Sequence, residues 1–132
     1  MPPGSHAVSV DAVLQLPAIR RYRHFLEQAL RTGEVWGLQE DGWALAVDAE
    51  GRDVFTLWPA PEYAVLCATR LWEGYAPHPI TLAELESVLL PELEAGGLML
   101  GIFNTPDGQG YPVSPSQLRE DLQAARARTP QA

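Results

Sequence analysis

The chain has 132 residues, of which 46% are hydrophobic and 20% are charged, and this composition is typical of one globular domain and excludes general disorder. No apolar run approaches the about 20 residues that a membrane-spanning helix needs. The single cysteine, Cys67, excludes an internal disulfide framework and a zinc site built from several cysteines. We expect residues 9–128 to form a single domain, between a flexible lead-in at 1–8 and a frayed C-terminus at 129–132.

The charge is negative overall and concentrated in the middle of the chain. Nine basic residues, all arginine, stand against seventeen acidic ones, for a net charge of −8. Residues 32–110 hold thirteen of the acids and only Arg52 and Arg70, a net of −11. Nucleic-acid binding uses clustered lysine and arginine, so this pattern argues against a nucleic-acid partner and is compatible with a basic protein partner. The alternative is that the acidic surface only keeps the protein soluble.

The first third of the chain predicts two helices. Ser9 and Asp11 favour a short helix over residues 10–16, and Pro17 suits the start of a second helix that ends at Gly33. Apolar residues recur at helical spacing along the second helix and predict its buried face, with Phe25 at the margin: Ile19, Tyr22, Leu26, Ala29 and Leu30. Arg20, Arg21, Arg23 and His24 are expected on the other side.

Residues 35–58 read as strands. Residues 35–39 are short and apolar, residues 43–48 and 53–58 place alternate side chains on opposite faces, and the short segments between them have turn chemistry. Because short loops join antiparallel neighbours, we expect a three-stranded antiparallel meander.

The second half predicts helices and strands in alternation. Prolines open a helix over residues 62–69, residues 72–75 read as a loop, and Pro77 and Pro79 keep Ala76 and His78 extended. Thr81 begins a capping box for a helix that Pro91 kinks or restarts. Residues 98–103 form an apolar run typical of a central strand, a short strand covers residues 111–113, and Ser114 caps the last helix. The predicted fold class is α+β, with about five mostly antiparallel strands in the order α-βββ-α-α-β-β-α and helices packed on at least one face.

The sequence contains no recognisable catalytic constellation. The absence of lysine excludes the usual phosphate-binding loop and lysine Schiff-base chemistry, and no Gly-x-Ser-x-Gly elbow occurs. Cys67 lies in an apolar helical segment, which favours a buried structural thiol. His24 and His78 are too far apart in sequence to indicate a metal site. We therefore assign no catalytic residue, no metal ligand and no cofactor.

The aromatic residues of the middle segment have two interpretations. All four tryptophans lie between residues 36 and 75, and they could fill the core with their N–H groups bonded at its edge. Alternatively, aromatic and acidic residues line a groove for an arginine- or lysine-bearing partner. The candidate binding residues are Trp58, Glu62, Tyr63, Trp72, Glu73 and Tyr75.

Ordered motifs carry a resemblance to a known family over about residues 11–125. They are Val35-Trp36-Gly37-Leu38, Asp41-Gly42-Trp43-Ala44, Phe55-Thr56-Leu57-Trp58-Pro59, Glu62-Tyr63-Ala64, Trp72-Glu73-Gly74-Tyr75, Pro79-Ile80, Leu90-Pro91, Asn104-Thr105-Pro106 and Val113-Ser114-Pro115. With these motifs the chain resembles the bacterial "domain of unknown function 2750" family. The resemblance implies a small, stand-alone, cytoplasmic bacterial protein and implies no activity. A fainter likeness to SseB-type domains rests on Phe55, residues 63–68 and 102–104, and Ser114-Pro115, and by analogy it favours an adaptor or immunity-like role.

These observations favour a non-catalytic protein-binding module over an enzyme. The expected protein is cytoplasmic, since the N-terminus lacks the features of a signal peptide, binds neither nucleic acid nor membrane, and is a monomer or weak homo-oligomer. The alternative is a small-molecule-binding protein or enzyme with a pocket near Trp58, Glu62, Trp72 and Tyr75, in which Glu62 or Glu73 would be the acid or base. A third possibility is self-association through exposed tryptophans across a two-fold axis.

Overall fold

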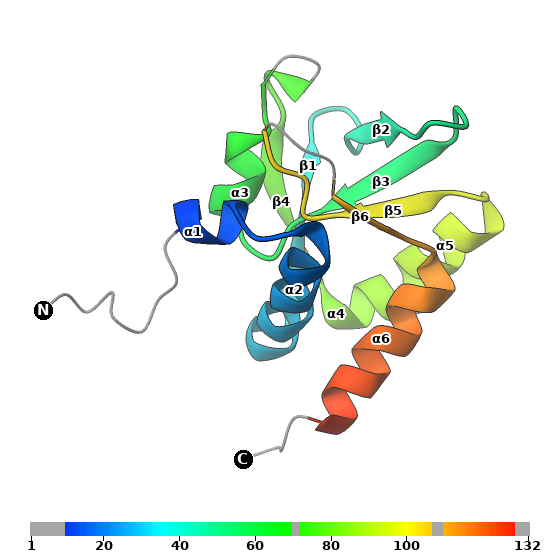
Figure 1. Cartoon of the computed structure of the whole chain (residues 1–132). Coiled ribbons are helices and arrows are strands. Elements are labelled where there is room, and N and C mark those ends of the chain that lie inside the picture. The colour runs from blue at the N-terminus through cyan, green and yellow to red at the C-terminus, as the bar shows by residue number, and fades with distance from the viewer. Residues whose placement is uncertain (1–9, 70–71, 107–109, 129–132) are drawn as a thin grey trace, which may run out of the picture.

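The computed structural model describes residues 10–69, 72–106 and 110–128. The predicted lead-in at 1–8 and C-terminal end at 129–132 therefore lie outside the described residues. The elements in chain order are α1 (Val10–Leu14), α2 (Ala18–Thr32), β1 (Glu34–Gln39), β2 (Leu45–Val47), β3 (Asp53–Leu57), α3 (Pro61–Leu66), β4 (Ala76–Thr81), α4 (Leu82–Glu84), the π-helical turn η3 (Leu85–Leu89), α5 (Leu90–Ala95), β5 (Met99–Ile102), β6 (Tyr111–Val113) and α6 (Pro115–Arg128). The predicted α+β class is confirmed (Figure 1).

The described strands form two sheets that meet at a bridge. One has the order β2-β3-β5-β6, and the other consists of β1 and β4. The backbones of Trp36 and Trp58 exchange two hydrogen bonds, which join β1 to the end of β3. All pairs are antiparallel except β3 with β5. A parallel pair requires a long crossover, and the chain from α3 through α5 provides it.

The predicted meander is wrong in one respect. β2 and β3 form the expected antiparallel hairpin, but β1 meets the start of the β2 segment only at the bridge between Gln39 and Trp43. Its main partner is β4, a segment that the sequence pattern predicted to be extended at Ala76 and His78 but did not identify as a strand. Pro77 and Pro79 lack the N–H group of a central strand, but an edge strand tolerates them, and β4 has β1 on one side only.

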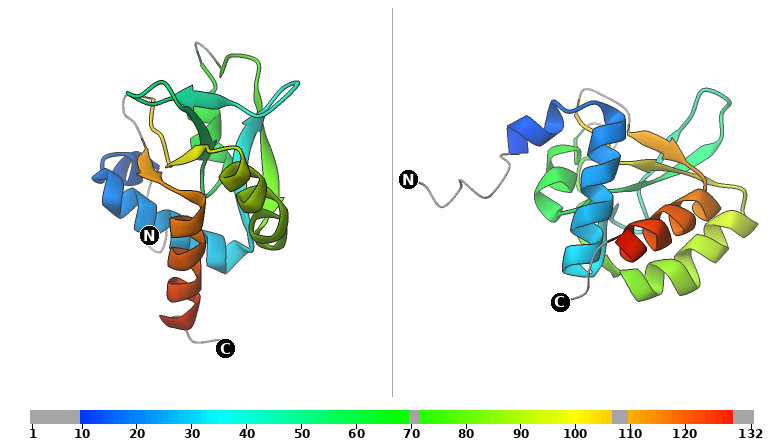
Figure 2. Two further views of the ribbon diagram at one scale, coloured as in Figure 1. Left: turned by 90° about the vertical axis from the view of Figure 1, so that its right-hand side faces the viewer. Right: turned by 60° about the horizontal axis from the view of Figure 1, so that its bottom comes forward.

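Helices α2, α4, α5 and α6 cover one face of the four-stranded sheet. In Figure 1, α2, α4, α5 and α6 lie below β3 and β5, and Figure 2 shows α6 running between α2 and the α4–α5 segment. The covered face contributes buried core residues, which are Phe55, Leu57, Leu100, Ile102 and Val113. The opposite face carries small or flexible residues at the alternate positions, which are Ala46, Val54, Met99, Gly101 and Pro112.

Helix α2 follows the predicted bounds, but its buried face is rotated from the predicted one. Gly33 ends the helix with a φ of 82°, the left-handed geometry that glycine adopts without strain. Phe25 is fully buried, whereas Ile19 is 42% exposed. Arg21, expected on the solvent side, is buried because its guanidinium bonds backbone carbonyls of the core.

The helical segment between β4 and β5 begins where the capping residue predicts. The side-chain oxygen of Thr81 accepts a hydrogen bond from the N–H of Glu84 at 3.1 Å. The π-helical turn η3 then precedes Pro91, which has no N–H to continue the α-helical hydrogen-bond pattern. Likewise, Oγ of Ser114 accepts from the N–H of Gln117 at 3.1 Å where α6 begins.

Candidate functional site

Trp58 follows directly on β3 and is a core residue. Its side chain has no exposed surface, and its indole N–H donates a hydrogen bond to the backbone carbonyl of Asn104 at 2.9 Å. The ring meets that of Trp72 edge-on, with centroids 6.1 Å apart. For Trp58 the structure agrees with the packing interpretation of the tryptophans, with the polar N–H satisfied inside the fold.

Cys67 shares the same acceptor. Its thiol donates to the carbonyl of Asn104, with sulfur and oxygen 3.4 Å apart, and the side chain is buried. Burial raises the pKa of this thiol to about 11, so it stays protonated at neutral pH. A protonated, buried thiol is a poor nucleophile, which agrees with the structural role predicted for it.

Tyr63 is also part of the core. It lies on the inner side of α3, where its ring packs against Phe103 with centroids 4.7 Å apart and meets the ring of His24 edge-on at 6.3 Å. Burial raises the pKa of Tyr63. Two of the six predicted binding residues, Trp58 and Tyr63, are therefore buried in the core.

The other four predicted residues reach the surface. Glu62 and Glu73 are exposed, and Trp72 and Tyr75 are half-buried. Trp72, Glu73 and Tyr75 come from the segment between α3 and β4, which runs to the top of the molecule in Figure 1.

The strand pairing brings the carboxylate of Glu40, and the turn that carries Asp41, to this segment. In the β1–β4 register the last residue of β1, Gln39, lies opposite the first residue of β4, Ala76. The turn after β1 and the loop before β4 are thus neighbours, and a Cβ placed on Gly74 would lie 3.1 Å from Oε2 of Glu40. Gly74 has a φ of 92°, which favours glycine at this close approach.

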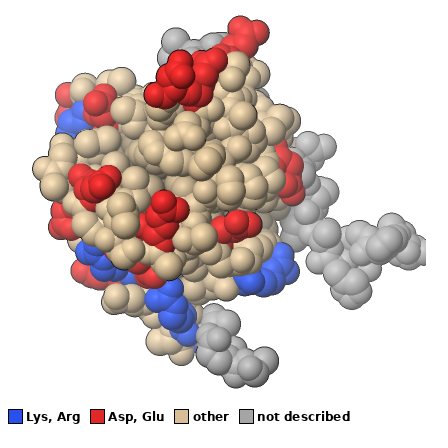
Figure 3. Space-filling view, turned by 180° about the vertical axis from the view of Figure 1, so that it is seen from behind, with Lys and Arg blue, Asp and Glu red and all other residues tan. Residues whose placement is uncertain are grey.

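We call this surface the acidic tip and define it by Glu40, Asp41, Trp72, Glu73 and Tyr75. The first two were missed as site residues because Glu40-Asp41-Gly42 reads only as turn chemistry, and nothing local indicates which strand pairs with β1. Figure 3 shows acidic side chains distributed over the face it draws, with a group at the top and most of the arginines toward the lower end.

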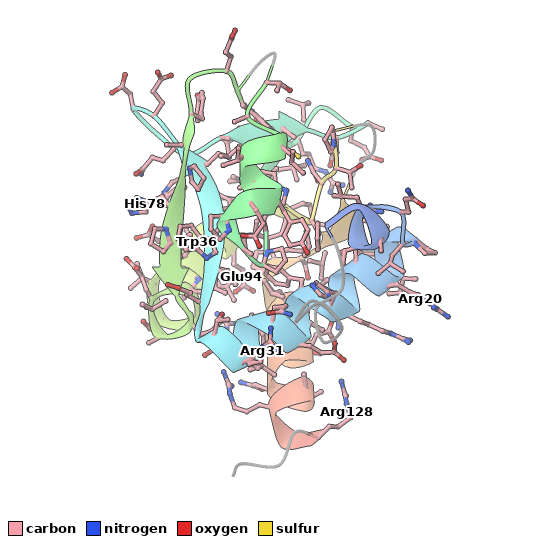
Figure 4. The ribbon with its side chains drawn as sticks, turned by 90° about the vertical axis from the view of Figure 1, so that its left-hand side faces the viewer. Arg20, Arg31, Trp36, His78, Glu94 and Arg128 are labelled. Carbon is pink, nitrogen blue, oxygen red and sulfur yellow. The ribbon has the colours of Figure 1, made fainter. Side chains whose placement is uncertain are left out.

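The remaining two tryptophans lie on the β1–β2 side. Trp43 packs its ring against Phe55 and edge-on against His78, with centroids 5.4 Å away in each case. Trp36 is half-buried on β1. Figure 4 shows Trp36 and His78 on the β1–β4 sheet.

Three grooves lie away from the predicted site. One of about 610 Å³ runs between α2, β6 and α6, and one of about 490 Å³ covers the open face of the four-stranded sheet. A third of about 310 Å³ lies along α2 beside Leu16 and His24. None of the six predicted residues lines any of these three.

The described part of the chain has neither a cluster of metal-binding side chains nor a helix suited to a membrane. It holds no group of three or more histidine, cysteine, aspartate or glutamate residues placed to bind a metal ion. No described helix combines the length and the apolar character needed to cross a membrane.

Comparisons with known proteins add a family and no activity. No curated protein matches this chain, and no solved structure matches it. These comparisons do not support the fainter likeness to SseB-type domains. A family model described as "Protein of unknown function (DUF2750)" matches residues 22–122, more than half of the chain. The chain therefore belongs to the DUF2750 family.

Proposed function

We propose that this protein is a non-catalytic protein-binding module, in an adaptor or immunity-like role, and that it binds a basic partner protein through the acidic tip. The observation that carries the proposal is the β1–β4 register. By placing Gln39 opposite Ala76, it sets the turn of Glu40 and Asp41 beside the loop that carries Trp72 and Glu73, with Glu40 close to Gly74.

The carboxylates of the tip are exposed. Glu40, Asp41 and Glu73 are exposed, and none of them forms an ion pair with a described arginine, whereas Asp48 and Glu86 are both held by one. Arg70 adjoins this loop in the sequence and lies outside the described residues. Like charges gathered at one end of a molecule create a field that attracts and orients a cationic partner.

The aromatic residues give this surface more than charge. Trp72 and Tyr75 are half-buried, so each ring is held by the fold on one side and open on the other. Tryptophan and tyrosine are common anchors in protein interfaces, and a guanidinium or ammonium stacked on such a ring gains cation–π attraction. An arginine-bearing surface fits this combination best.

Helix α3 extends the surface. Glu62 is exposed on its first turn, and Val65 and Leu66 are 53% and 39% exposed. These apolar side chains offer contact area beside the carboxylates, while Trp58 and Tyr63 hold the segment from the core. The six residues predicted from the sequence thus divide into four that contact the partner and two that support them.

We also propose that the protein is bacterial and cytoplasmic and that it binds neither nucleic acid nor membrane. In this proposal it acts as a monomer or weak homo-oligomer. Prolines in the edge strands β4 and β6 support the last point, namely Pro77, Pro79 and Pro112. They remove N–H groups that strand addition between copies would use.

A capture experiment with matched charge variants tests this function. The immobilised protein is incubated with lysate of its native host, beside Glu40→Gln/Asp41→Asn/Glu73→Gln and a control that neutralises three exposed carboxylates elsewhere, Glu27→Gln/Glu92→Gln/Glu120→Gln. We expect a protein that wild type and control both retain and the tip variant loses, with retention falling as salt rises. The same proteins on all three, or none at any salt, would overturn the proposal.

A further inference from the structure

A second surface differs from the acidic tip because it is a groove with a net positive charge. The groove between α2, β6 and α6, which we call the α2–α6 groove, has a volume of about 610 Å³. Apolar side chains form much of its lining, and they are Ile19, Leu26, Met99, Tyr111 and Val113. Its charged residues are Arg23, Asp121 and Arg128, which give the groove a net charge of +1. The whole protein, in contrast, has a net charge of −8.

The two arginines come from different elements and have no acidic partner among the described residues. Arg23 lies on α2 and Arg128 is the last residue of α6. Both side chains are exposed, yet neither forms an ion pair with a described carboxylate, whereas Arg52, Arg119 and Arg126 all do. Figure 4 shows Arg128 at the end of α6, with Arg20 and Arg31 along α2.

The carboxylate of Asp121 is held by other groups in the groove. One of its oxygens accepts a hydrogen bond from the hydroxyl of Tyr22 at 2.6 Å, and the other accepts from the side-chain amide of Gln117 at 2.9 Å. These two bonds fix the carboxylate between α2 and α6. The guanidiniums of Arg23 and Arg128 therefore remain available to an anion from outside.

The lining offers an apolar body a place to lie. The rings of Tyr22 and Tyr111 stack with centroids 4.7 Å apart and planes 24° apart, which presents the half-buried Tyr111 as a flat wall. Ile19 is 42% exposed although it belongs to the apolar pattern of α2, and it faces this groove. The volume falls within the range of about 300–1,000 Å³ typical of small-molecule sites.

We propose that the α2–α6 groove is a binding site for a small organic anion. The apolar part of the ligand lies against Ile19, Met99 and Tyr111, and its carboxylate or phosphate group is bound by Arg23 and Arg128. Guanidinium groups suit either anion because their N–H donors match two oxygens at once. The site is separate from the acidic tip and does not depend on the proposed function.

Four small molecules test separately whether the groove binds the anionic group and the apolar part of a ligand. Binding of 4-phenylbutyrate, 4-phenylbutyl phosphate, inorganic phosphate and the neutral 4-phenyl-1-butanol is measured by calorimetry. Methyl resonances of Ile19 and Leu26 in NMR spectra report the place of binding, since both line this groove and neither lines the other two. We expect at least one aryl anion to bind saturably and to shift the methyl signals of both residues, and the alcohol and inorganic phosphate to bind at least about tenfold more weakly. The two aryl anions compared with each other identify the preferred headgroup.

Arginine variants test the anion contact. Arg23→Gln and Arg128→Gln should each weaken the preferred aryl anion about tenfold, the usual effect of losing a hydrogen bond to a charged group. Arg20→Gln is the control, since Arg20 is an exposed arginine of α2 that does not line this groove. All three side chains are exposed, so we expect the fold to be retained, and circular dichroism of each variant checks this. Equal affinity for the alcohol, equal loss in the control, or no saturable binding of either aryl anion would overturn the proposal.

Discussion

The side chain of Arg21 holds the backbone carbonyl of Phe103, 82 residues further along the chain. The Nε–H donates to this carbonyl at 3.1 Å, and an Nη1–H donates to the carbonyl of Leu16 at 2.6 Å. One guanidinium thus connects α2 with the residue that follows β5 and with the turn that precedes α2. Arg21 is only 7% exposed, and burial lowers its pKa.

We predict that Arg21→Met destabilises the protein by about 2–4 kcal/mol, because methionine fills the space but leaves backbone carbonyls without their donors. Urea denaturation followed by circular dichroism measures the free energy of unfolding. Arg20→Met is the control, since Arg20 is exposed on the same helix and its loss should cost within about 0.5 kcal/mol. Equal stability of the two variants would show that the buried contacts of Arg21 contribute little.

Phe103 itself has a φ of 67°, a left-handed conformation that is rare for a bulky residue. Its ring is fully buried against Tyr63 and His24, and its N–H donates to the carbonyl of Leu57 at 2.8 Å. The surrounding contacts therefore hold a backbone geometry that costs about 1–2 kcal/mol for a residue with a Cβ.

This geometry predicts an inverted order of stability. Phe103→Ala and Phe103→Gly both lose the ring, but the glycine variant should be more stable than the alanine variant by about 1 kcal/mol, since glycine has no Cβ to strain. At the buried helical position Leu122, the order should be the ordinary one, with alanine above glycine. Thermal unfolding of the four variants checks the comparison, and alanine above glycine at both positions would contradict it.

The pKa of Cys67 predicts a pH dependence of stability on the alkaline side. Burial raises the thiol pKa from 9.0 to about 11, so the folded state keeps its proton at a pH where the unfolded state loses it. The contribution is fully present below pH 9 and is lost as pH rises toward 11, at up to about 1.4 kcal/mol per pH unit.

Urea denaturation between pH 7.5 and 11 tests this dependence in wild type and Cys67→Ala. Burial also raises the pKa values of Tyr22 and Tyr63, and these groups act in both proteins, so the difference between the two curves isolates the thiol. The wild type should lose stability more steeply across this window. Parallel curves would mean that the thiol ionises as readily in the folded protein as in the unfolded one.

Much of the local structure could be predicted because its causes lie within a few residues. The helical spacing of apolar residues before Gly33, the hydroxyls of Thr81 and Ser114, and the apolar run at 98–103 all act on their own turn or strand. The structure confirms α2, both caps and the buried strand β5. The same patterns could not place Arg21 or Ile19, because which side chain is buried depends on the elements that pack against the helix.

The same distinction between local and long-range causes applies to the candidate site. The sequence by itself determined the α+β class, the membership suggested by the ordered tryptophan motifs, and the acidic character of the middle segment. Only the tertiary structure decided that β1 pairs with β4, that Glu40 lies beside Gly74, and that Trp58 is interior while Trp72 is half-buried. The physical reason is that strand partners and burial are set by contacts between residues far apart in the chain, whereas caps, turns and periodicity are set by near neighbours.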